Sequence, residues 1–118
     1  MPFILEMVVG AGLVDLWIPA CRSLKEKRSV LAKIVKRTQN TFNVSIAEVG
    51  DNDSWKQAKI GFCVVGNDRR YINAKVDHIF NYIEEMGIAQ VISSHLEITS
   101  YSEWLNMQSE GADKYGDF

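Results

Sequence analysis

The sequence predicts a single α+β domain built from four strands and two helices. Three observations predict this class. Two segments repeat apolar residues at helical spacing, four segments are strand-like, and turn-forming residues separate them. Of the 118 residues, 47% are hydrophobic and 24% are charged, which is the balance of a globular protein with a core of its own.

The first two elements are a strand and a helix. Residues 7–18 alternate apolar side chains with Asp15 and Trp17, which predicts a half-buried strand with these two residues on the other face. Ser23 and Glu26 then have the spacing of a capping box, so we expect a helix over residues 24–40. Its apolar side chains form one stripe that packs on the sheet.

The rest of the chain predicts a hairpin, a second helix and a last strand. Residues 42–49 and 56–65 are rich in Val, Ile and Phe, and a Gly-Asp-Asn-Asp turn separates them. A helix follows the Asn-Asp pair at 67–68 and ends at Gly87. In the strand expected over 88–101, one face carries Ile92, Leu96 and Ile98, and the other carries Ser93, His95, Glu97 and Thr99.

This order, β-α-β-β-α-β, is that of a ferredoxin-like fold. Right-handed crossovers place both helices on one face of a four-stranded antiparallel sheet, with strand order 4-1-3-2. We expect one domain over residues 1–107 and a polar, flexible tail over 108–118. The other face of the sheet stays open to solvent, a ligand or a second subunit.

Positive charge is concentrated on the first helix. The segment 22–37 holds seven of the thirteen basic residues and one acid, a local balance of +6, whereas the rest of the chain sums to −8. A solvated helix face is the ordinary explanation, but an anionic partner would need such a concentration. We therefore expect contacts to RNA phosphates from the basic side chains of this segment, which are Arg22, Lys25, Lys27, Arg28, Lys33, Lys36 and Arg37.

The open sheet face suggests two other possibilities. It could be a subunit interface, since aromatic residues are enriched in interfaces, and we expect a homodimer through this face or an adjacent edge strand. It could instead hold the ligand site of a small enzyme around Trp17, His95 and Glu97. The side chains expected on this face are Asp15, Trp17, Lys59, Cys63, His95 and Glu97, with Leu13 and Val91 beside them.

Several short motifs resemble a known family. The segment 18–28 contains Arg-Ser-Leu-Lys-Glu-Lys-Arg, the segment 42–49 reads Phe-Asn-Val-Ser-Ile-Ala-Glu-Val, and Trp55 precedes the third strand. Over about residues 7–101 the chain resembles the bacterial YlxP-like family, a domain of unknown function. The resemblance implies a ferredoxin-like fold. Members are often encoded among translation and ribosome-maturation genes, which implies a role linked to RNA. The resemblance brings no established catalytic residues.

No residue set identifies a reaction, a cofactor or a metal. The acids Glu48, Asp51 and Asp53 lack the spacing of a calcium loop, and Gly10-Ala11-Gly12 lies inside a strand rather than a dinucleotide-binding loop. Two cysteines are too few for a disulfide framework, and no window reaches the ~20 apolar residues of a membrane span. We expect a cytoplasmic, non-enzymatic RNA- or ribosome-associated factor; an adaptor for an acidic protein partner is a third alternative.

Overall fold

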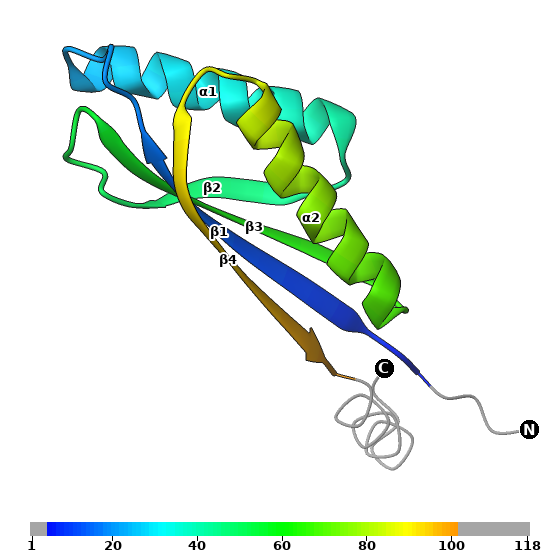
Figure 1. Ribbon diagram of the computed structural model, residues 1–118. Coiled ribbons are helices and arrows are strands. Elements are labelled where there is room, and N and C mark those ends of the chain that lie inside the picture. Colours follow the sequence, from blue (N-terminus) through cyan, green and yellow to red (C-terminus); the bar gives the residue numbers. More distant parts are fainter. Residues whose placement is uncertain (1–4, 102–118) are drawn as a thin grey trace, which may run out of the picture.

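A computed structural model describes residues 5–101 of the chain. Its elements follow the expected order and are β1 (Val8–Trp17), α1 (Leu24–Thr41), β2 (Ser45–Gly50), β3 (Gln57–Gly66), α2 (Arg69–Glu85) and β4 (Gln90–Ser100). The strands form one antiparallel sheet with the order β2-β3-β1-β4 (Figure 1). The predicted α+β ferredoxin-like fold and strand order are confirmed. The expected boundary between domain and tail, at 107/108, lies outside the described residues.

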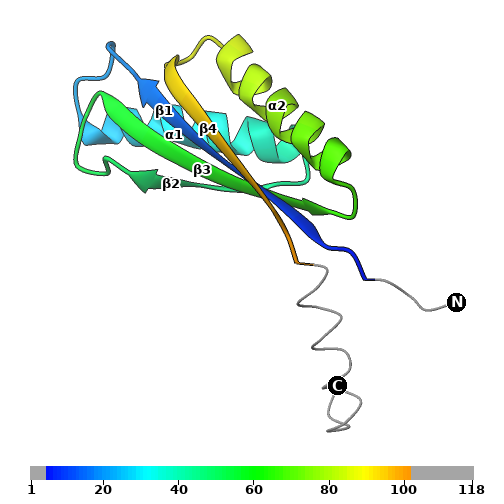
Figure 2. The ribbon, with the colours of Figure 1, turned by 60° about the horizontal axis from the view of Figure 1, so that its bottom comes forward.

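The core lies between the sheet and the two helices. Even-numbered residues of β1 and β3 face α2, whose Ile72, Val76 and Ile79 are fully buried. Gly10 belongs to this face of β1, because a Cβ atom there would lie 2.6 Å from a methyl group of Ile72. A side chain at this position would push α2 off the sheet, so the glycine serves close packing. Figure 2 shows that no described helix covers the opposite face of the sheet.

Both helices begin with the caps that the sequence predicts. The Ser23 hydroxyl accepts a hydrogen bond from the Glu26 N–H at 3.1 Å, and the Glu26 carboxylate accepts one from the Arg22 N–H at 2.7 Å. The Asp68 carboxylate accepts from the first turn of α2. Because these side chains satisfy N–H groups that have no partner inside a helix, they set where each helix starts.

The second strand begins later than the sequence suggested. Phe42 is the C-terminal cap of α1, its N–H donates to the Thr38 carbonyl at 2.8 Å, and β2 starts only at Ser45. The Phe42 ring packs edge-on against Tyr82 of α2, with 5.3 Å between ring centroids. The apolar residue that resembled the start of a strand therefore joins the two helices instead.

The prediction for the faces of β4 was wrong at its first half. The register between β1 and β4 shifts between Asp15 and Leu16, so that Asp15 pairs with Ser93 while Leu16 pairs with Val91. This irregularity moves Val91 to the core side and leaves Ile92 exposed, the reverse of the expectation. One extra residue in one strand exchanges the faces of all residues beyond it, and a local alternation pattern cannot show where that happens.

Candidate functional site

Six basic side chains of the α1 segment are exposed. Five lie on the helix and the sixth, Arg22, comes just before it; within the part of the chain that the structure describes, none of the six forms an ion pair with an acid. The acid of the first turn, Glu26, is occupied by the cap. The face that α1 turns to solvent is therefore uncompensated positive charge, carried by Arg22, Lys25, Arg28, Lys33, Lys36 and Arg37.

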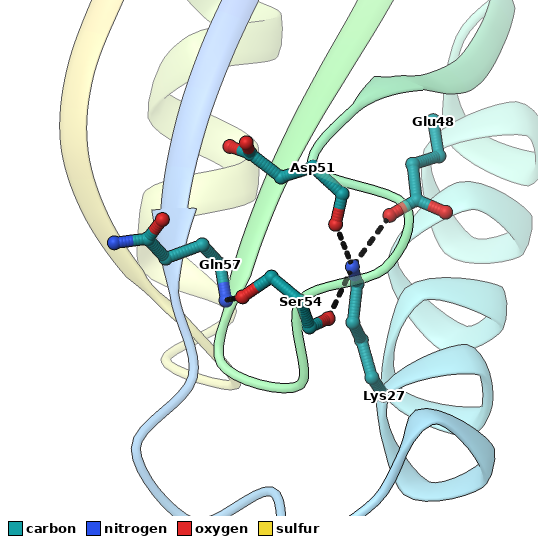
Figure 3. A network of polar contacts seen from close by, with 5 residues as sticks. All are labelled: Lys27, Glu48, Asp51, Ser54 and Gln57. Atoms are coloured by element: carbon teal, nitrogen blue, oxygen red, sulfur yellow. Dashed lines mark hydrogen bonds and ion pairs between the residues drawn. The ribbon is translucent and has the colours of Figure 1, made fainter.

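The seventh expected phosphate ligand, Lys27, is not part of this surface. Its side chain is 1% exposed, and its ammonium group donates to the backbone carbonyls of Asp51 at 2.5 Å and Ser54 at 2.6 Å. The same nitrogen lies 2.9 Å from the Glu48 carboxylate (Figure 3). The expectation of a solvent-exposed Lys27 was wrong, because three oxygens of β2 and the following turn replace the water that the charge gave up on burial.

The Lys27 cluster, made of Lys27, Glu48, Asp51 and Ser54, fixes the turn between β2 and β3. Asp51 has a left-handed backbone conformation, with φ of 60°, and its carbonyl also accepts from the Ser54 N–H at 3.0 Å. The Ser54 hydroxyl accepts from the Gln57 N–H at 3.1 Å, where β3 begins (Figure 3). Glu48 Oε2 is buried and makes no well-aligned hydrogen bond, so the Lys27 ammonium is its compensating group.

This turn also presents an aromatic residue that the site prediction missed. Trp55 follows Ser54 directly, and the residue is 53% exposed. The turn lies at the same end of the molecule as the start of α1, as Figure 1 shows. An exposed tryptophan beside a basic helix can stack on a nucleic acid base. Its position in a turn, between polar residues, is the sequence signal that could have found it.

On the open sheet face, the structure brings Asp15 and Lys59 together. The Lys59 ammonium and the Ser93 hydroxyl each donate to the Asp15 carboxylate, both at 2.5 Å. The hydrogen bond from Lys59, followed by that from Ser93, holds the pKa of Asp15 below its usual value. The same contact with Asp15 raises the pKa of Lys59. The charges of Asp15 and Lys59 neutralise each other, and both groups are engaged in these contacts.

The other residues expected on this face do not converge on one site. His95 pairs with Leu13 and Glu97 with Ala11, whereas Trp17 lies between Gln57 and Gln90 at the far end of β1. Leu13 and Trp17 are four positions apart in β1, which is a distance of about 13 Å along the strand. Because Trp17 is this far from His95, the residues of the alternative ligand site do not surround one ligand.

The cysteines and the described acids do not form a further cluster. Cys21 is buried and Cys63 is exposed, and both are free thiols. Burial raises the pKa of the Cys21 thiol, which makes it a poor nucleophile. Within residues 5–101, no three His, Cys, Asp or Glu side chains are grouped so as to hold a metal ion. None of the described helices is both long and apolar enough to cross a membrane.

Comparisons with known proteins bear on the family. Residues 9–96 match the family described as "Protein of unknown function (DUF503)". The chain is also similar to "Uncharacterized protein YlxP" of Bacillus subtilis (strain 168), with 40% identity over 77 residues. That match covers 65% of this chain and 84% of the relative. The region that matches the family, residues 9–96, contains the basic helix, the Lys27 cluster and most of β4.

Three solved structures resemble the chain distantly. The de novo designed protein Foldit4 has 14% identity and a TM-score of 0.42, over 81% of this chain and 96% of that one. LarC2, the C-terminal domain of a cyclometallase, has 11% identity and a TM-score of 0.45, over 81% and 57%. The YXEP protein of Bacillus subtilis, an M20 family peptidase, has 16% identity and a TM-score of 0.47, over 96% and 33%. Scores this low carry no functional argument.

Proposed function

Because the chain belongs to the DUF503 family of proteins of unknown function, we propose a function from its own surface. The protein is a non-enzymatic RNA- or ribosome-associated factor that binds the phosphate backbone through the exposed cations of α1. The observation that carries the proposal is that six basic side chains reach solvent there, with no ion pair to any described acid.

The arrangement of these cations suits an extended polyanion. Lys25, Lys33 and Lys36 point away from the core, since they lie opposite the buried residues of the helix. Eleven residues separate the first and the last of them, about 16 Å along the helix. Several consecutive phosphates can be contacted over such a length, and a nearby exposed Trp55 offers a face for a base. We place this role in the cytoplasm.

The test is a binding measurement as a function of salt. If about four phosphates are neutralised, the affinity for a labelled single-stranded RNA falls with a log–log slope of about −3 against salt concentration. Lys33→Glu together with Lys36→Glu, both exposed, is expected to weaken binding at low salt at least tenfold and to make the slope shallower. Fluorescence anisotropy measures both.

The control is a matched pair of substitutions on the other helix. Arg70→Glu with Lys75→Glu on α2 changes the net charge by the same amount, and its affinity is expected to stay within about threefold of the wild type. A flat salt response contradicts the proposal. So does an equal loss in both double variants, because that result reports the total charge rather than the α1 surface.

A further inference from the structure

The two edges of the sheet differ in how well they are protected. The edge strand β2 has six residues, and its register is irregular between Glu48 and Gly50. The edge strand β4 has eleven residues, and from Ser94 to Ser100 it pairs with β1 without interruption. Natural sheets shield their edges with short strands, bulges, Lys or Pro. The regular half of β4 has no bulge and contains neither Lys nor Pro.

The open edge of β4 exposes peptide groups at alternate residues. The Tyr101 N–H donates towards β1, to the Met7 carbonyl at 2.8 Å. In an antiparallel ladder these directions alternate, so Ser94, Leu96 and Ile98 turn their N–H and C=O groups to the outside. The Ile98 carbonyl already accepts a long bond from the Arg69 guanidinium, at 3.3 Å, and keeps a second lone pair. This edge can therefore accept another strand.

The side chains along this edge fit a second copy of the same strand. His95 and Glu97 lie on the open face, and Leu96 between them points to the other face, where α2 leaves it 39% exposed. When two β4 strands pair about a two-fold axis at Leu96, each His95 lies opposite the Glu97 of the other copy. The two Leu96 side chains also lie opposite each other. An imidazole N–H can donate to the carboxylate, and opposite partners across strands stabilise a sheet.

The neighbouring registers are worse. Side chains alternate between the two faces along a strand. Each face of the joined sheet is therefore continuous only when the two-fold axis passes through a residue and not between two residues. An axis at Glu97 places two carboxylates opposite each other, which is destabilising. An axis at His95 places His95 opposite itself and leaves Glu97 opposite Ser93. Only the axis at Leu96 forms two His–Glu pairs.

We propose that this protein forms a two-fold dimer by antiparallel pairing of the β4 edges, in the register centred on Leu96. The result is a continuous eight-stranded sheet with all four helices on one face. The occupant is a second copy because its own sequence supplies the complementary residues at the required spacing. This inference is independent of RNA binding, since α1 packs against β2, the opposite edge strand of the sheet.

The first test is a charge exchange measured by sedimentation equilibrium. The wild-type full chain is expected to dimerise at micromolar concentrations. His95→Glu places two acids opposite each other at both pairs and should raise the dimer Kd at least tenfold, and Glu97→His should also raise it. The double variant His95→Glu with Glu97→His restores the pairs in reverse and should return the Kd to within about threefold. Both positions are exposed, and circular dichroism verifies the fold of each variant.

The second test locates the axis by cross-linking. In a Cys63→Ser background, Leu96→Cys places two thiols at directly opposed positions, with Cα atoms about 5.5 Å apart, which a disulfide can bridge. Ser94→Cys is the control, because its two copies lie about 13 Å apart along the strands. A wild-type monomer at 100 μM overturns the proposal, as does a swap that fails to restore the dimer, or cross-linking that favours Ser94→Cys.

Discussion

Two lysines among residues 5–101 contact a carboxylate, and they do so in opposite environments. Lys27 lies under the β2–β3 turn with its side chain 1% exposed, and it contacts two backbone carbonyls as well as Glu48. Lys59 lies on the open sheet face with its side chain 42% exposed, and Asp15 is its one polar partner within the described residues. The sequence assigns both the same charge.

The difference teaches that burial, rather than charge, separates a structural lysine from a surface lysine. Water can replace Asp15 at Lys59, so this contact adds little to the fold. If one of the three oxygens around the buried Lys27 is removed, solvent cannot take its place, so each oxygen is needed for stability. The basic surface of α1 is consequently smaller by one cation than its sequence suggests, and the missing cation holds together the helix and the turn.

The largest expected effect follows from removing Lys27. Lys27→Ala leaves Glu48 buried without a counter-charge, removes the ammonium from two carbonyls and opens a cavity. We expect a loss of about 3–5 kcal/mol in the free energy of unfolding, measured by urea denaturation. The matched control is Lys25→Ala on the exposed face of the same helix, with an expected change within about 0.5 kcal/mol. Equal stability of the two variants contradicts a structural role for Lys27.

A smaller effect is expected from Glu48→Gln. The substitution keeps the shape of the side chain and one oxygen acceptor, but it removes the negative charge beside the Lys27 ammonium. Because the two backbone carbonyls remain, we expect a loss of about 1–2 kcal/mol, less than for Lys27→Ala. The control is Glu84→Gln, at an exposed position of α2. If Glu48→Gln is as stable as this control, the carboxylate contributes nothing to the cluster.

The fold could be predicted from the sequence because each element carries its own signal. The capping box at Ser23 and Glu26, the Asp68 cap and Gly87 after α2, with φ of 66°, all lie within a few residues of the boundary that they define. The irregular pairing at Ile92 depends on how β4 meets β1, far away in the chain. Alternation within one strand carries no information about it.

The role of Lys27 was partly visible in the sequence. Four and seven residues after it stand Leu31 and Ile34, which are buried, so helical spacing alone puts Lys27 on the apolar stripe. Its partners were not visible, since two of them are backbone carbonyls, and any residue type has a carbonyl. They belong to a turn 24 or more residues away. The sequence therefore indicated an unusual lysine without indicating what it binds.

The smallest expected effect concerns Asp15 and depends on pH. The contacts with Lys59 and Ser93 hold the pKa of Asp15 below the value of about 3.9 that it has in an unfolded chain. The contribution to stability is therefore complete above pH 4 or so and disappears as the pH falls through the lower pKa of the folded state. The raised pKa of Lys59 implies a second loss, when the pH rises past the ordinary lysine value of about 10.4. We expect Asp15→Asn to be slightly less stable than the wild type at pH 7, and the difference in urea denaturation to shrink as the pH falls below about 4. A difference that stays the same from pH 7 to pH 2 contradicts this account, because a lost ion pair must follow the protonation of its acid.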